Sequence, residues 1–194
     1  FAITIYVIFD HFDGLQAKKT GTGSPLGEIL DHYSDVFNGS IILYYFFRIL
    51  QIELDWIFYL VIWANLVAFT VTYLEQSIRK ELYFGKIGSL EGVLLILFIL
   101  GSLMTSQGKY FWLKNTLFDF PLYIFLVIGL ILGVVFTVAG SIRRLRHIPT
   151  TLIHYFLTGA LICFICINYQ ISWYISFLVI NVYSADLILK SMKF

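Results

Sequence analysis

Six apolar runs, separated by short polar segments, constrain this chain more than any other feature. They lie at residues 26–51, 55–78, 89–105, 118–140, 151–168 and 172–189. A helix needs about 20 apolar residues to cross the hydrocarbon core of a bilayer, and each run approaches or exceeds that length. With 59% hydrophobic and 13% charged residues, the composition excludes a water-soluble globular protein. We therefore expect an all-α, polytopic bundle of six near-complete transmembrane helices.

The first residues form a further apolar segment that is too short to span a membrane. It lacks the basic start and the small-residue cleavage site of a signal peptide. We interpret residues 1–12 as an N-terminal helix stub, the last turns of a helix whose beginning is missing, with at least one span before it. No low-complexity linker divides residues 1–194. The sequence therefore predicts a single membrane domain that is incomplete at its N-terminus.

The thirteen Lys and Arg residues divide unevenly between the two membrane faces if successive helices alternate in direction. An excess of basic residues marks the cytoplasmic side of a membrane protein. We expect the end that carries residues 10–35 to face the cytoplasm, or the matrix or stroma of an organelle. Three residues fall on the opposite side, namely Arg48, Lys109 and Lys114. Ten fall on the expected cytoplasmic side, namely Lys18, Lys19, Arg79, Lys80, Lys86, Arg143, Arg144, Arg146, Lys190 and Lys193.

Several other residues have structural interpretations. A net charge of +1 gives no electrostatic footprint for a nucleic-acid partner. Cys163 and Cys166 lie inside an apolar run and are expected to pack as small apolar groups. Glu75, inside the 55–78 run, is expected to face the bundle interior or a water-filled cavity near the site. A basic cluster is expected to set the topology and to contact lipid headgroups: Arg143, Arg144, Arg146 and His147.

Four carboxylates fall at helical spacing on either side of a short polar connection. Asp10 and Asp13 are three residues apart, and Asp31 and Asp35 are four apart, so each pair shares one face of a helix. Such a cluster at shallow membrane depth repels itself unless a cation compensates it. Carboxylate oxygens suit Mg²⁺, Mn²⁺ or Ca²⁺, and two ions would form a clamp for displacement at phosphorus. The alternative, carboxylates solvated only by headgroup water, explains four aligned acids poorly.

Small and basic residues lie between the two acidic pairs. Gly14, Ala17 and Gly27 have little or no side chain, and Gly27 precedes Asp31 by one helical turn. A bulky planar group could therefore lie against the backbone at this point. Lys18 could neutralise a phosphate as a point charge. We interpret these four residues as candidate substrate-binding positions.

The combined pattern is Asp10-x-x-Asp13-Gly14-x-x-Ala17-Lys18-x8-Gly27-x-x-x-Asp31-x-x-x-Asp35. It closely resembles the signature of the CDP-alcohol phosphatidyltransferase family. The one departure is Lys18, where the family usually has Arg. The runs Ser24-Pro25-Leu26-Gly27-Glu28 and Asp31-His32 narrow the resemblance to the eukaryotic choline and ethanolamine phosphotransferases. Leu82-Tyr83-Phe84-Gly85 and Leu90-Glu91-Gly92 resemble a later segment of that branch.

The resemblance implies transfer of phosphoethanolamine or phosphocholine from its CDP ester to diacylglycerol, with release of CMP. It makes Asp10, Asp13 and Asp31 ligands of two ions, Mg²⁺ or Mn²⁺. Asp35 is either a ligand or the base that accepts the lipid hydroxyl proton, and His32 and Glu91 are alternative bases. The implied partners are CDP-ethanolamine or CDP-choline, diacylglycerol and membrane lipids. The implied location is the endoplasmic reticulum or Golgi membrane, with the active site toward the cytoplasm.

Other interpretations stay open at this point. The chain is shorter than typical members of the branch, and it carries Lys18 in place of Arg. It could therefore be an inactive relative that serves as a structural or lipid-organising subunit of a membrane complex. A different acceptor, such as inositol or glycerol phosphate, and an organellar membrane also remain as alternatives. The sequence does not show whether the transferred headgroup is ethanolamine or choline. It also does not show whether the chain forms a homodimer or is a subunit of a larger complex.

Overall fold

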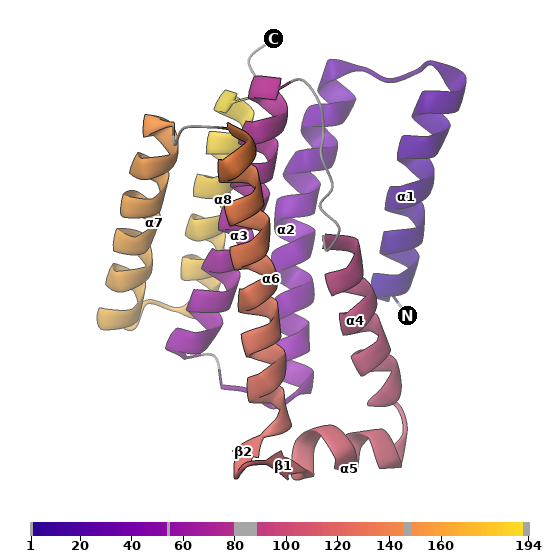
Figure 1. The fold of residues 1–194 in the computed structure, drawn as a ribbon, viewed down its shortest axis with the longest axis vertical. Helices are drawn as coiled ribbons and strands as arrows, with labels where there is room; N and C mark the ends of the chain where they lie inside the picture. The colour runs from indigo at the N-terminus through magenta and orange to yellow at the C-terminus, as the bar shows by residue number, and fades with distance from the viewer. Residues whose placement is uncertain (1, 54, 80–88, 146–148, 192–194) are drawn as a thin grey trace.

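The computed structural model describes residues 2–53, 55–79, 89–145 and 149–191, and within these ranges the chain is almost entirely helical. Figure 1 shows long helices that run side by side along the long axis of the molecule. The elements are α1 (Ala2–Thr20), α2 (Pro25–Ile49), α3 (Trp56–Arg79), α4 (Ser89–Ser102), α5 (Ser106–Lys114), β1 (Thr116–Leu117), β2 (Phe120–Pro121), α6 (Leu122–Leu145), α7 (Thr150–Asn168) and α8 (Trp173–Ser191). The predicted all-α class is confirmed.

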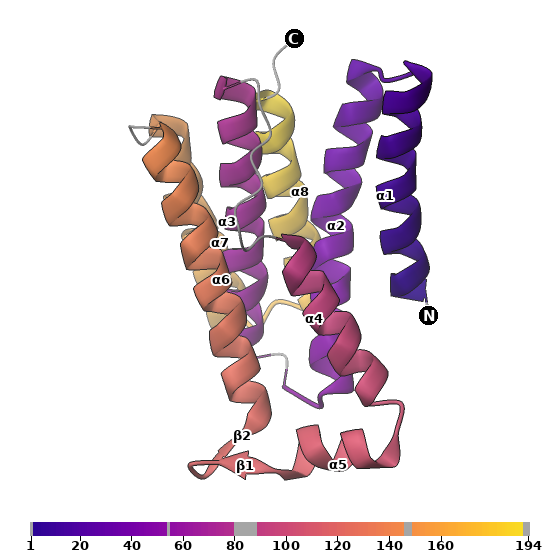
Figure 2. The same ribbon diagram turned by 45° about the vertical axis from the view of Figure 1, so that its right-hand side comes forward.

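Helix α3 is the centre of the bundle. It packs against α2, α6, α7 and α8, and both views show it surrounded by them (Figures 1 and 2). Buried aromatic and aliphatic side chains of α2 and α3 form the middle of the main core, among them Phe46, Phe47, Phe58 and Leu66. Helix α1 lies outside this group, beside α2. Side chains of α3 can therefore contact more of the other helices than side chains of any other described helix can.

The connection between α1 and α2 is set by local sequence signals. Gly21 follows the last residue of α1 with a φ of +66°, a conformation that glycine adopts without steric cost. The amide of Thr22 donates to the carbonyl of Ala17, as in the Schellman ending of a helix. Helix α2 then begins at Pro25, and the Ser24 side chain accepts from the Gly27 amide. These signals turn the chain back within a few residues, so the end of α1 lies near the start of α2.

Two of the predicted runs differ from the observed helices. The 89–105 run ends as a helix at Ser102, and the chain bends by 112° into α5. Thr105 caps α5 by accepting from the Gly108 amide, which starts a new helix in place of extending the old one. The 118–140 run begins as a helix only at Leu122, because the preceding residues form the β1–β2 hairpin. Helix α5 and this hairpin lie across one end of the bundle (Figure 2).

The predicted number of spans is not confirmed. Within the described residues, four helices are long and apolar enough to cross a membrane, namely α3, α6, α7 and α8, and the bent α4–α5 pair would make a fifth. Helix α2 has the length of a span, but it carries Glu28, Asp31, Asp35 and Arg48. Its three acidic residues lie in the half that contributes to the carboxylate cluster, and Arg48 lies in the last turn. The chain is thus an integral membrane helix bundle whose span count stays a prediction.

Candidate metal and substrate site

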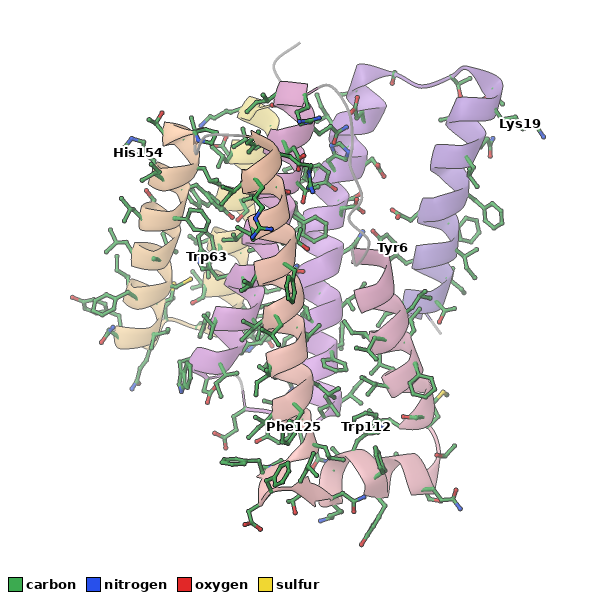
Figure 3. All side chains as sticks on the ribbon, viewed as in Figure 1. Tyr6, Lys19, Trp63, Trp112, Phe125 and His154 are labelled. Atoms are coloured by element: carbon green, nitrogen blue, oxygen red, sulfur yellow. The ribbon has the colours of Figure 1, made fainter. Side chains whose placement is uncertain are left out.

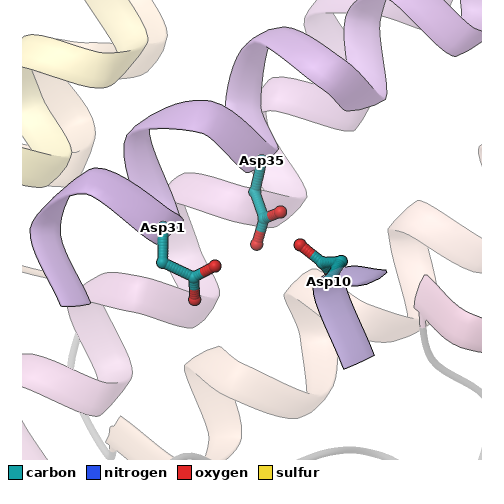
Figure 4. A group of neighbouring side chains, drawn as sticks. All are labelled: Asp10, Asp31 and Asp35. Carbon is teal, nitrogen blue, oxygen red and sulfur yellow. The ribbon is translucent and has the colours of Figure 1, made fainter. Parts of the chain in front are cut away.

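Three of the four predicted carboxylates converge. Each of Asp10, Asp31 and Asp35 offers one oxygen, and these oxygens lie within 4.8 Å of one another. Asp10 comes from α1, and the other two come from successive turns of α2, as the spacing of four residues predicts. Figure 4 shows the three carboxylates turned toward a common point between the two helices. The Asp13 side chain, predicted to belong to the same cluster, lies outside the part that the structure describes.

Two tyrosine hydroxyls bond to Asp35, one on each carboxylate oxygen. Tyr6 of α1 donates to Oδ1 at 2.7 Å, and Tyr73 of α3 donates to Oδ2 at 3.1 Å. The Tyr6 hydroxyl is also 3.2 Å from Asp10 Oδ1, so it bridges the carboxylates of two helices. Figure 3 shows Tyr6 on the side of α1 that faces the bundle. Asp35 is therefore fixed by contacts from both neighbouring helices.

His32, an expected alternative base, is buried next to this network. Only 6% of its surface is exposed, and its ring stacks on the ring of Tyr73 with centroids 4.0 Å apart and an angle of 28° between the planes. Tyr73 therefore contacts both Asp35 and His32. One turn earlier on α2, the Glu28 carboxylate accepts from the Gln76 amide of α3 at 2.9 Å. The start of α2 and the end of α3 are thus joined by polar contacts at the site.

Glu75 faces the bundle interior, as predicted, and it has specific partners there. The Glu75 carboxylate is 1% exposed and forms a two-pronged ion pair with the guanidinium of Arg144 on α6. Ser141 also bonds to the same guanidinium, at 3.1 Å. The Arg144 side chain thus ties α6 to α3, and its expected part in topology and headgroup contact stays a prediction. Arg146 and His147 lie outside the described residues.

The predicted substrate-binding residues are grouped at the same end of α1 and α2. Gly27 is exposed in the first turn of α2, where a Cβ would come within 3.2 Å of the Ser24 Oγ. Ala17 is half-buried in the last turn of α1, and its carbonyl accepts the Thr22 amide. Gly14 and Lys18 belong to the same helix, but their side-chain surroundings lie outside the described part. The same holds for Glu91 on α4, while residues 82–85 are not described at all.

The donor set fits a divalent cation of the hard type. Among the described residues it consists of carboxylate oxygens, without the sulfur or imidazole ligands that favour zinc. Three negative charges within 4.8 Å repel one another strongly in a partly buried setting. Mg²⁺ or Mn²⁺ would relieve that repulsion and accept the same ligands. The chemistry that such a centre supports is binding and activation of a phosphate or diphosphate group.

Sequence reasoning missed Tyr6 and Tyr73. Tyr6 precedes Asp10 by four residues, a spacing that brings two helical side chains together and could have drawn attention to it. Tyr73 is 38 positions from Asp35. It is one of thirteen tyrosines in a strongly aromatic chain. Only the packing of α3 against α2 distinguishes it from the others.

Fold and site together define an integral membrane helix bundle with a carboxylate cluster, of the kind that holds a divalent cation, at one end. The comparison with known families is consistent with this class. The chain belongs to the CDP-alcohol phosphatidyltransferase family, because the sequence model of that family matches residues 1–139.

Relatives of this chain include choline and ethanolamine phosphotransferases, which confirms the resemblance to that branch at modest identity. An uncharacterized CDP-alcohol phosphatidyltransferase class-I family protein of Schizosaccharomyces pombe is 33% identical over 111 residues, 57% of this chain and 28% of the relative. Cholinephosphotransferase 1 of Rattus norvegicus is 26% identical over 150 residues, which cover 74% of this chain and 36% of the relative. Choline/ethanolaminephosphotransferase 1 of Saccharomyces cerevisiae is 27% identical over 95 residues, which cover 48% of this chain and 24% of the relative.

The matched part of this chain thus spans only 24–36% of the length of these relatives. No solved structure gives a significant match to the chain.

Proposed function

We propose that this chain carries the catalytic centre for transfer of phosphoethanolamine or phosphocholine from its CDP ester to diacylglycerol, with release of CMP. The observation that carries the proposal is the convergence of Asp10, Asp31 and Asp35 at the signature that identifies the family. The relatives named cholinephosphotransferase and choline/ethanolaminephosphotransferase support this class of donor. The matched part of the chain is short relative to these proteins, so the activity of the whole protein is part of the proposal.

In this reaction, the acceptor hydroxyl oxygen forms a bond to the phosphorus that bears the ethanolamine or choline. The bond from that phosphorus to the oxygen of CMP breaks, and CMP leaves with the electron pair. The hydroxyl proton passes to a base of the chain. Asp35 and His32 are the two described candidates, and Glu91 on α4 is the third. His32 lies one residue from Asp31 and stacks against Tyr73, close to the cluster.

Asp10, Asp13, Asp31 and Asp35 would hold the cations, Mg²⁺ or Mn²⁺ and two in number. When bound, these ions neutralise charge on the diphosphate of the donor and on the departing CMP. Lys18 lies one turn beyond Gly14 on α1, where its ammonium would add a further positive charge. Gly14, Ala17 and Gly27 have little or no side chain, so they would leave the backbone open to a planar group such as the cytosine base. Asp35 would serve either as a ligand or as the proton acceptor.

The expected setting is a membrane that supplies diacylglycerol, the endoplasmic reticulum or the Golgi, with the cluster toward the cytoplasm. The C-terminal ends of α1, α3, α6 and α8 and the N-terminal end of α2 lie at one end of the bundle in Figure 1. Most of the Lys and Arg residues within the described ranges belong to that end, which supports this orientation. A water-soluble CDP ester could reach the cluster from that face, while the lipid acceptor would approach from the bilayer.

The deciding experiment supplies the membrane-embedded protein with labelled CDP-ethanolamine or CDP-choline, together with diacylglycerol and Mg²⁺. We expect label to enter lipid with one donor preferred over the other, and we expect none without diacylglycerol. The preferred donor would assign the headgroup. If neither label enters lipid although the chain is folded in the membrane, the transferase proposal is wrong. The chain would then serve as a structural or lipid-organising subunit.

A further inference from the structure

Tyr73 occupies a position that the transfer reaction does not by itself explain. It lies on the buried face of α3, in the second turn from the end of the helix, and only 6% of its surface is exposed. A buried hydroxyl needs a partner, and that of Tyr73 donates to Asp35 Oδ2 at 3.1 Å. The bond joins the central helix of the bundle to the carboxylate cluster.

The aromatic ring of Tyr73 is held on two sides. Phe69, one turn earlier on α3, lies with its centroid 6.0 Å from that of Tyr73 and nearly parallel to it. On α2, the His32 ring stacks against Tyr73 at 4.0 Å. A ring packed in this way has little freedom to rotate, so its hydroxyl stays directed at one oxygen of Asp35.

Tyr6 bonds to the other oxygen of Asp35, but its situation differs. Its hydroxyl lies between two carboxylates, 2.7 Å from Asp35 and 3.2 Å from Asp10, in the space where the cluster converges. The Tyr73 hydroxyl comes from α3, a helix that carries none of the three carboxylates, and it donates to Asp35. Tyr73 can therefore orient Asp35 from a helix outside the two that carry the carboxylates.

We infer that Tyr73 is a positioning residue for this site: its hydroxyl fixes the orientation of Asp35 and its ring fixes His32. The expected effect of Tyr73 on turnover rests on the proposed function. The expected effect of Tyr73 on cation binding does not. Groups that bond to a metal ligand from outside orient that ligand, and their removal typically costs about 10- to 100-fold in metal affinity or activity. The same order of loss is expected here.

The test uses Tyr73→Phe, which removes the hydroxyl and keeps the ring against His32. Tyr59→Phe is the matched control. Tyr59 is a buried tyrosine on the same helix, and its hydroxyl has no partner among the described hydrogen bonds. Binding of Mn²⁺ alone to the full, purified chain is followed by electron paramagnetic resonance after removal of bound metal. We expect Tyr73→Phe to raise the half-saturating Mn²⁺ concentration about 10-fold or more, and Tyr59→Phe to leave it unchanged.

A second measurement shows whether Tyr73 acts through Asp35. In an Asp35→Asn background, Tyr73→Phe should cause no further loss of Mn²⁺ binding, since the group that it orients has already changed. Equal additional losses in both backgrounds would overturn the inference. So would an unchanged Mn²⁺ affinity in Tyr73→Phe, or equal losses in Tyr73→Phe and Tyr59→Phe.

Turnover separates this inference from the proposed function. If the wild-type chain transfers label into lipid, Tyr73→Phe should lower kcat about 10-fold or more, with KM for the CDP ester within about twofold. An active wild type with an unaffected Tyr73→Phe variant overturns the inference and leaves the function standing. If the wild type is inactive but its Mn²⁺ binding depends on Tyr73 as described, the inference stands and the function falls.

Discussion

At the scale of single residues, Asp31 is the carboxylate of the cluster most open to solvent, since Asp10 and Asp35 are half-buried. If Asp31 is a metal ligand as proposed, we expect Asp31→Asn to lower transfer activity by at least about 100-fold. A neutral amide then replaces a charged ligand, and the bound cation contributes several kcal/mol to stabilising the transition state. The control is Asp186→Asn, which changes an exposed acid in an ion pair with Lys190 on α8. Initial rates over a range of Mg²⁺ concentrations measure both, and turnover that survives a chelator would contradict the metal account.

Lys18 allows a second prediction at this scale. If its ammonium binds the diphosphate of the donor, Lys18→Ala should weaken CDP-ester binding by about 1–3 kcal/mol, as loss of a charge-assisted hydrogen bond does. Lys18→Arg should preserve or strengthen binding, since a guanidinium binds phosphate through two bonds. Lys19→Ala is the control, because Lys19 is exposed and points away from the bundle at the end of α1 (Figure 3). Calorimetric titration with CDP-ethanolamine and CDP-choline measures the affinity of the wild type and of the three variants. Equal affinities in all four proteins would show that Lys18 does not bind the donor.

How far the site follows from the sequence depends on the distance between its residues. Asp31 and Asp35 share a helix, so their spacing alone predicts that they lie together. Asp10 joins them because a short connection returns the chain, which Gly21 and Ser24 signal locally. Tyr73 comes from another element, and its contact depends on the register of α3 against α2. No local rule fixes that register, so this part of the site required the structure.

At the scale of elements, the ion pair between Glu75 and Arg144 holds α6 against α3. We expect Arg144→Ala to destabilise the chain by about 3 kcal/mol, because a buried carboxylate loses its cation. Arg143→Ala should change stability by no more than about 0.5 kcal/mol, since Arg143 is exposed on the same turn of α6. Thermal unfolding in detergent compares the two variants.

A double variant tests whether the loss comes from the pair itself. Glu75→Gln combined with Arg144→Ala should cost less than the sum of the single losses, because the neutral amide no longer needs a cation. If the two single losses of stability added up exactly in the double variant, the side chains would contribute independently. That result would contradict the stabilising ion pair inferred from the bonds between them.

Element boundaries were predictable where hydropathy changes sharply and were not where the chain bends within an apolar run. The 151–168 and 172–189 runs correspond to α7 and α8 within a residue or two. The 89–105 run continues apolar to its end, but Thr105 and Gly108 start a new helix at 112° to the old one. Thr105 is the last residue of that run, and a single threonine is a weak signal for a helix start because threonine also occurs within membrane helices. The β1–β2 hairpin was not predicted, because its two turn residues, Phe118 and Asp119, are not the Asn-Gly or Asp-Gly pair typical of tight hairpins.

At the scale of the whole molecule, the orientation in the membrane is still a prediction from charge. The α1–α2 connection lies at one end of the bundle, and α5 lies across the other (Figures 1 and 2). Cysteines placed at exposed positions near these ends report the side from which a membrane-impermeant maleimide can reach them. Lys19→Cys marks the first end and Lys109→Cys marks the second. The two native thiols, Cys163 and Cys166, are buried and should give little background.

We expect Lys19→Cys to react only with reagent on the cytoplasmic side and Lys109→Cys only with reagent on the opposite side. The physical reason is the excess of Lys and Arg at the end that carries the carboxylate cluster, since basic residues are retained in the cytoplasm during insertion. The two positions control for each other, because sealed vesicles must protect one while they expose the other. Labelling of both from one side would place α5 and the α1–α2 connection on the same face, against the bundle in Figure 1. Exchange of the two patterns would keep the fold and turn the cluster toward the lumen, where a cytoplasmic CDP ester could not reach it.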